Sequence, residues 1–313
     1  MSQFHISQKN YSKKILRSSY ITLFTVAFLI GIKGLAFHLS NSIILLSVLA
    51  DSIWDFIISL TSLILVSVSL RKSNRNFRWG FGKLESMASF LEALFILLIS
   101  ISILIIAVNR YFNPVVFLPY SNLAIIVMII SLIVTFVLVR YQTHVLKETN
   151  SQSVESNRQH YLADILTNLA AIIGLVLVSY NFVIVDSLVA GMISIYLVYT
   201  TIPIFKKSIN VLIDKEIDQD LRKEIIDLIL DHNKIVDCHN VRGRVSGNKI
   251  FLEAHLVISQ HASFKVSHSI IHEVEENLKK RFGSIDFVGH ADPEDVAENE
   301  HNEHNEHNEH NES

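Results

Sequence analysis

The stretch SVLADSIWDFIISLTSLILV, from Ser47 to Val66, is long and apolar enough to cross a membrane, yet it contains Asp51 and Asp55. About 20 predominantly apolar residues span the hydrocarbon core of a bilayer. A carboxylate at the centre of a transmembrane helix costs about 2.5–3.5 kcal/mol on insertion scales, so two cost about 5–7 kcal/mol without compensation. The pair therefore predicts a compensating positive charge and a function inside the membrane.

Similar apolar stretches fill the first two thirds of the chain and predict six membrane spans. The chain has 313 residues, of which 50% are hydrophobic. A stretch at residues 161–205 fits two spans, and four others fit one span each: Ile15–Leu39, Ile43–Leu70, Met87–Tyr111 and Leu123–Val139. The first of these is too long for a signal-peptide core, so we expect it to be retained. Residues 1–213 are thus predicted to form a membrane all-α bundle of six transmembrane helices.

Lysine and arginine in the short loops predict the orientation of this bundle. Cytoplasmic loops carry an excess of both residues. They gather before the first span, between spans two and three, between spans four and five, and after span six. The opposite loops hold little more than Lys33 and Arg110, and we expect Lys33 and His38 to extend to the outer surface. Both termini are therefore predicted to be cytoplasmic.

A second pair of polar residues has the same spacing as the two aspartates. His160 and Asp164 lie four residues apart at the start of the fifth span, so on a helix each pair shares one face. Three carboxylates and one imidazole suit a tetrahedral divalent cation such as Zn²⁺. The alternative for a single intramembrane aspartate is a packing hydrogen bond or a protonated state. For Glu92, which has no partner at helical spacing, we favour such a structural role and leave its part in transport open.

The last third of the chain has the pattern of a small soluble α+β domain, predicted for residues 214–292. Ser246-Gly247-Asn248 is typical of a hairpin turn, and Gly283 stands where a helix commonly ends. The single cysteine, Cys238, excludes an intrachain disulfide. The expected order is αββαβ, with a helix at Asp218–Asp231, strands at Ile235–Val245 and Lys249–Ile258, a helix at Phe264–Arg281 and a strand at Ile285–Val288.

The motifs DSIWD and HYLAD, six spans and this C-terminal domain together resemble the cation diffusion facilitator family, and within it the bacterial ferrous-iron and zinc efflux pumps. The resemblance runs from about Ser18 to Pro293. It implies a proton-coupled antiporter of the inner membrane, not an enzyme, that exports Zn²⁺, or else Fe²⁺ or Cd²⁺, by alternating access. It also implies a homodimer, protons as counter-ion, a metallochaperone-like C-terminal domain, and transport ligands at Asp51, Asp55, His160 and Asp164.

The resemblance also implies a cytoplasmic binuclear zinc site. His239 and His255 would hold one ion, His268 and His290 the other, and Asp292 would bridge them, with His290 and Asp292 placed after the last strand. Taken alone, each histidine fits an ordinary surface or hydrogen-bonded position better than a ligand role. The same family joins its two parts by a charge pair, here Lys83 with Asp214, for which two unrelated interfacial charges are the alternative. A further zinc site of some relatives is expected to be absent, because Asn74, Phe77 and Phe81 stand at its positions.

Residues 293–313 form a tail rich in His, Asn and Glu without the apolar residues needed to fold. We expect it to be disordered, or to bind metal weakly. Expected partners are a lipid bilayer, a second copy of the chain and a divalent metal, and no nucleic acid. The functional alternatives are a non-transporting membrane metal sensor and an intramembrane metal-dependent hydrolase, although no HExxH motif is present.

Overall fold

The computed structural model describes residues 8–40, 43–113, 122–179, 183–259 and 261–294. The chain separates into two units, one at Lys9–Ile213 and one that contains the residues from Asp214 onward. Almost the whole histidine-rich tail, residues 295–313, lies outside the described part. The two units are described separately below.

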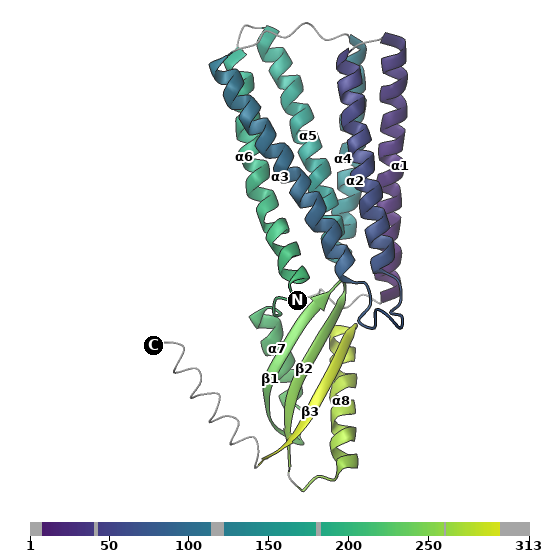
Figure 1. Ribbon diagram of the computed structural model, residues 1–313, viewed down its shortest axis with the longest axis vertical. Helices are drawn as coiled ribbons and strands as arrows, with labels where there is room; N and C mark the ends of the chain where they lie inside the picture. Colours follow the sequence, from purple (N-terminus) through teal and green to yellow (C-terminus); the bar gives the residue numbers. More distant parts are fainter. Residues whose placement is uncertain (1–7, 41–42, 114–121, 180–182, 260, 295–313) are drawn as a thin grey trace. The chain divides into compact units, whose positions relative to one another are not determined.

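The membrane unit consists of long helices, as predicted (Figure 1). Among the described residues, five helices are long and apolar enough to cross a membrane. The remaining helix, α5, has its apolar half in residues 170–179, whose side chains are outside the description. The helices are α1 (Gln8–Ser40), α2 (Ile43–Ser69), α3 (Lys83–Phe112), α4 (Asn122–Thr149), α5 (Gln152–Ser179) and α6 (Val183–Leu212).

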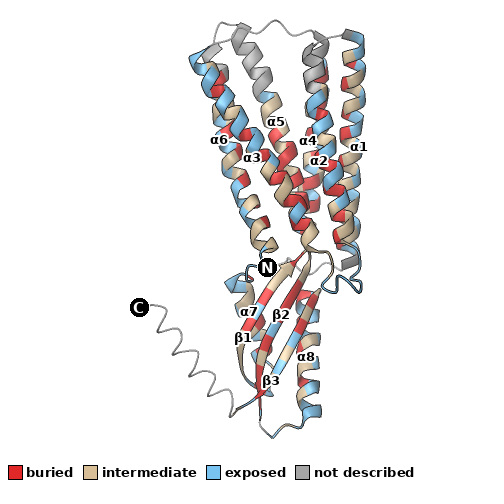
Figure 2. Cartoon of the chain, viewed as in Figure 1, coloured by how far each residue is buried: buried red, intermediate tan, exposed pale blue. Residues whose placement is uncertain are grey.

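Buried and exposed residues alternate around each of these helices, as expected for helices with one face in the bundle and one toward lipid (Figure 2). Large apolar side chains such as Phe24, Ile133 and Tyr199 are exposed. The buried faces are rich in serine, including Ser59, Ser89, Ser156, Ser194 and Ser208. Small polar residues let membrane helices approach closely and hydrogen-bond with one another. Helix α5, which packs against α3, α4 and α6, is central to this packing.

The second unit has the predicted αββαβ order. Its elements are α7 (Gln219–Leu230), β1 (Ile235–Ser246), β2 (Lys249–Ile258), α8 (Phe264–Phe282) and β3 (Ile285–Pro293). The strands form one sheet in the order β1-β2-β3, in which β2 is antiparallel to β1 and parallel to β3. A single apolar core joins helices and sheet through residues such as Ile225, Leu256 and Leu278.

The prediction that the last strand ends at Val288 is wrong. Strand β3 continues to Pro293, and its parallel pairing with β2 is unbroken over that length. Close packing within the strand favours a glycine at position 289, because a Cβ there would lie 3.0 Å from both Ile271 Cγ2 and Phe287 Cε1. His290 and Asp292 therefore lie on a paired strand and not in a following loop.

Candidate metal centre

Asp55 of α2 and His160 and Asp164 of α5 form the first group of potential metal ligands. One ligand atom from each lies within 4.8 Å of the others. His160 Nε2 is 3.2 Å from Asp55 Oδ1 and 3.9 Å from Asp164 Oδ2. His160 is buried, whereas the two carboxylates are partly accessible. The three side chains can thus present one nitrogen and at least two oxygens to a single cation.

Asp51 is not part of this group of three. It lies one helical turn before Asp55 on α2 and is exposed. Helix geometry places the two carboxylates on the same side of α2. Its predicted role as the fourth ligand therefore remains a prediction.

A buried hydrogen bond holds α2 against α5 beside the group. The hydroxyls of Ser59 and Tyr161 are 2.6 Å apart, and Tyr161 directly follows His160. The rings of His160 and Tyr161 meet edge to face, with centroids 5.1 Å apart. These contacts restrict the orientation of the imidazole toward Asp55.

Glu92 has its partners on neighbouring helices. It is buried on α3 and accepts hydrogen bonds from the Ser156 hydroxyl and from Asn157 Nδ2, the latter at 2.5 Å. Asn157 Nδ2 also lies 3.2 Å from Ser62 Oγ of α2. Because Ser156 and Asn157 lie one turn before His160, Glu92 connects α3 to the helix that carries two of the ligands. Helical spacing within α3 gave no signal of these contacts.

Glu85, which the sequence analysis did not single out, has a similar position near the start of α3. It is buried and accepts hydrogen bonds from Tyr11 Oη at 2.9 Å and from Ser151 Oγ at 2.5 Å. These contacts tie α3 to α1 and to the residues that lead into α5. Two buried carboxylates, Glu85 and Glu92, thus lie seven residues apart on α3 and both face the beginning of α5.

The prediction that Lys33 extends to the outer surface is wrong. Lys33 is only 7% exposed, and its Nζ donates to Ser52 Oγ at 2.5 Å. It lies on the face of α1 that also buries Val26, Leu29 and Ala36, so the helix turns it inward. The nearby His38 is exposed.

The second group of potential ligands lies on the sheet. His239 of β1, His255 of β2 and Asp292 of β3 each offer a ligand atom within 4.8 Å of the others. Asp292 is 5% exposed, and its Oδ2 is 2.8 Å from His255 Nδ1 and 3.5 Å from His239 Nε2. Its Oδ1 is 2.7 Å from His290 Nδ1. Strand register explains the grouping, since His255 is paired with both His239 and His290.

His268 belongs to neither group of described residues. It is exposed on α8, whose buried face carries Ile270, Val274 and Leu278. The structure therefore brings three of the four predicted histidines around Asp292. The assignment of His268 to a second ion remains a prediction.

Cys238 precedes His239 but does not have the character of a metal ligand. Burial, with a smaller contribution from the Asp237 carboxylate, raises the pKa of the Cys238 thiol to about 12. The thiolate is the form that binds metal. The thiol is therefore protonated at neutral pH, and Cys238 packs against the domain core.

Lys83 and Asp214, the predicted charge pair, fall in different units. Lys83 Nζ donates to the Leu212 carbonyl oxygen at 3.0 Å, and Asp214 accepts from Arg244 Nη1 at 3.0 Å. Their mutual pairing stays a prediction.

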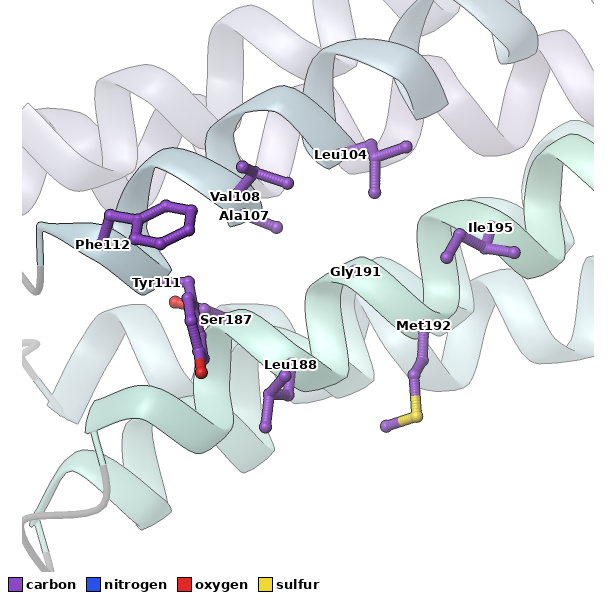
Figure 3. A pocket seen from close by; sticks show the side chains of 10 residues that line it. All are labelled: Leu104, Ala107, Val108, Tyr111, Phe112, Ser187, Leu188, Gly191, Met192 and Ile195. Atoms are coloured by element: carbon purple, nitrogen blue, oxygen red, sulfur yellow. The ribbon is translucent and has the colours of Figure 1, made fainter.

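A pocket between α3 and α6 has an apolar lining, unlike the two groups of potential metal ligands (Figure 3). Side chains such as Leu104, Val108, Leu188 and Met192 line it, and none of its lining residues is charged. Its lining contains no carboxylate, imidazole or thiol.

A membrane bundle in which a histidine and two aspartates gather between helices, followed by an αββαβ domain with a second group of potential ligands, is typical of a membrane transporter of metal cations. Residues 19–213 match the cation efflux transmembrane domain, and residues 217–294 match the cytoplasmic domain of cation efflux proteins. The chain belongs to the cation diffusion facilitator family.

Similar relatives include proteins called cation-efflux pump FieF. Those of Escherichia fergusonii and Escherichia coli (strain K12 / DH10B) are each 29% identical over 294 residues, and that of Shigella boydii serotype 18 is 29% identical over 292 residues. Each alignment covers 93% of this chain and 97% of the relative. A solved structure of a putative zinc transporter, CzrB in its zinc form, is 23% identical with a TM-score of 0.25, covering 26% of this chain and 93% of that one.

Membership of this family settles the coarse function. The chain is a cation efflux transporter and not an enzyme, and it is a multi-pass membrane protein with a cytoplasmic C-terminal domain. The membrane hydrolase and the non-transporting sensor are therefore set aside.

Proposed function

We propose that this transporter exports Zn²⁺ from the cytoplasm in exchange for protons, with Asp51, Asp55, His160 and Asp164 as the transport ligands. The observation that carries the proposal is the convergence of Asp55, His160 and Asp164 within 4.8 Å. Mixed imidazole and carboxylate ligands suit Zn²⁺, and the same donors also accept Fe²⁺ and Cd²⁺. Zinc is the preferred cargo in this proposal, with iron and cadmium as alternatives.

Exchange of metal for protons is expected because the same ligand atoms can bind either a metal ion or protons. His160 Nε2 lies close to a carboxylate oxygen on each side, so a proton held there occupies the position that a metal ion needs. Ligands must lose their protons to bind metal. Metal binding from the cytoplasm releases protons, and protons from the opposite side displace the metal when the bundle opens there.

We further propose a homodimer in the inner membrane with both termini in the cytoplasm. The match to the dimer-forming cytoplasmic domain and the distribution of basic loop residues support this arrangement. In this proposal the cytoplasmic domain holds one zinc at His239 and His255 and a second at His268 and His290, with Asp292 between them. That metal is structural and is not the transported ion.

The proton coupling is testable with purified protein in liposomes that contain a zinc-sensitive dye. We expect zinc uptake to be saturable and to accelerate when the liposome lumen is more acidic than the outside. Collapse of the gradient by a protonophore should remove the acceleration. Zinc uptake that is saturable but indifferent to the proton gradient would refute the coupling and leave the zinc transport in place.

The choice of metal should depend on the imidazole. His160→Asp converts the ligand set to oxygen alone, which favours harder ions such as Mn²⁺ over Zn²⁺. We expect competition uptake assays to show at least about a tenfold loss of preference for Zn²⁺ over Mn²⁺ in the variant. Glu155→Asp on the same helix, at a carboxylate paired with Lys207, serves as the control. An unchanged order of preference would place selectivity elsewhere.

A further inference from the structure

Lys33 is a buried ammonium group directly beside the aspartate-bearing face of α2. Its Nζ donates to Ser52 Oγ at 2.5 Å, and Ser52 itself is 1% exposed. Ser52 immediately follows Asp51 and precedes Asp55 by three residues. Ionisable residues inside membrane spans are costly and usually functional. The hydroxyl of Ser52 is neutral, so it cannot balance the lysine charge.

Lys33 lies near the proposed transport ligands. It donates to Ser52, which stands between Asp51 and Asp55 on α2. Asp55 in turn offers a ligand atom within 4.8 Å of those of His160 and Asp164. Three ionised aspartates, one divalent cation and one ammonium together carry no net charge. Lys33 therefore completes the charge balance of the loaded site.

The position of Lys33 along the membrane places it on the release side of the site. The cytoplasmic domain follows α6, so the end of α6 is cytoplasmic, and the preceding helices alternate in direction. Helix α1 accordingly begins, and α2 ends, at the cytoplasmic side. Lys33 in the second half of α1 and Asp51 in the first half of α2 are then farther from the cytoplasm than Asp55.

We propose that Lys33 is a fixed cation of the transport site, which shares the aspartates with the transported metal, lowers metal affinity and speeds release to the side away from the cytoplasm. This inference rests on the proposed transport function of Asp55 and Asp164. A mobile metal ion must bind firmly enough to be captured and weakly enough to leave. A tethered ammonium that competes for the same carboxylates reduces the residence time of the metal without blocking its access.

The test compares variants that remove the charge with one that keeps it. Lys33→Met removes the charge at similar length, Lys33→Gln removes it but retains a donor for Ser52, and Lys33→Arg retains it. Lys14→Met makes the same change at a partly exposed residue of α1 that pairs with Glu148. Zinc binding is measured on the full chain for each variant, and again for the same variant with Asp55→Ala and Asp164→Ala added. The binding that is lost on adding these two changes is assigned to the membrane site. Zinc flux is measured in liposomes.

We expect Lys33→Met and Lys33→Gln to bind zinc at least about tenfold more tightly, as expected when a like charge is removed in a medium of effective permittivity about 20. Their maximal flux and KM should both fall. Lys33→Arg and Lys14→Met should resemble the unchanged protein. Lys33→Gln decides the question if Lys33→Met fails to fold.

Unchanged affinity in the neutral variants, or an equal change in Lys33→Arg, would overturn the role of the charge. Weaker zinc binding in the neutral variants would also overturn it, because it would assign Lys33 to structure alone. If zinc flux persists in Asp55→Ala/Asp164→Ala, the proposed transport site itself is wrong, which is a separate result from the failure of the lysine inference.

Discussion

Asp164→Ala should reduce zinc flux through the reconstituted transporter by at least about 100-fold, since even loss of a residue that only supports a metal ligand costs 10–100-fold. Asp164 supplies one of the two carboxylates that flank His160, whose Nε2 lies 3.9 Å away. Its loss leaves a site with one fewer charge and one fewer oxygen for a cation that must shed its water. Asp55→Ala should have an effect of the same size, because Asp55 Oδ1 lies 3.2 Å from the same nitrogen.

The matched control for this prediction is Glu155→Ala. Glu155 lies on the same helix as Asp164 but pairs with Lys207 at 2.8 Å, away from the three ligands. Its flux should stay within about twofold of the unchanged protein, because a partly exposed ion pair contributes little. Size-exclusion profiles and thermal unfolding should show that all three variants insert and fold. Undiminished, saturable zinc flux in Asp164→Ala would refute the assignment of this ligand.

Asp292→Ala should abolish the zinc-dependent protection of the sheet in the cytoplasmic domain. Asp292 contacts His239, His255 and His290, so its carboxylate connects all three histidines of the group. A metal that binds only the folded state adds about 2.7 kcal/mol of stability at a concentration of 100 times its Kd. Some amides in β1, β2 and β3 exchange only when the whole domain unfolds. Exchange of these amides should slow by about 100-fold when zinc is bound.

The measurement uses the full chain carrying Asp55→Ala and Asp164→Ala, so that the membrane site cannot bind metal. Following exchange in the strands alone also separates this site from the histidine-rich tail. Asp286→Ala is the matched control, because Asp286 lies on the same strand and pairs with Lys249 at 2.6 Å. Zinc protection that persists in Asp292→Ala, or that disappears equally in Asp286→Ala, would contradict the assignment.

Periodicity and turn residues in the sequence were sufficient to predict the fold, but they predicted the ends of individual helices and strands less well. Apolar runs predicted the helical membrane bundle, and the alternation of helix and strand signals predicted αββαβ. The last part of β3, residues 289–293, was missed, because its pairing with β2 is a tertiary relation that the sequence of the strand does not reveal.

The same limit applies to the candidate sites. Spacing within one helix indicated that Asp55 shares a face with Asp51, and His160 with Asp164, because that relation is local. It could not indicate that Glu92 meets Ser156 and Asn157, since those contacts join two helices. For Lys33, the sequence showed a long side chain near the end of a span, and the choice between solvent and the bundle interior depends on the rotation of α1 in the tertiary structure.

The most direct test of the central claim is X-ray absorption spectroscopy of zinc bound to the membrane site. The protein should carry replacements of His239, His255, His268, His290 and Asp292 by alanine and end before the histidine-rich tail, so that the proposed cytoplasmic ligands retain no zinc. The account predicts one bound zinc with a single imidazole nitrogen and carboxylate oxygens at about 2.0–2.2 Å, and no sulfur. It also predicts that Asp55→Ala/Asp164→Ala removes this zinc. A spectrum without imidazole, or zinc that survives the loss of both aspartates, would contradict it.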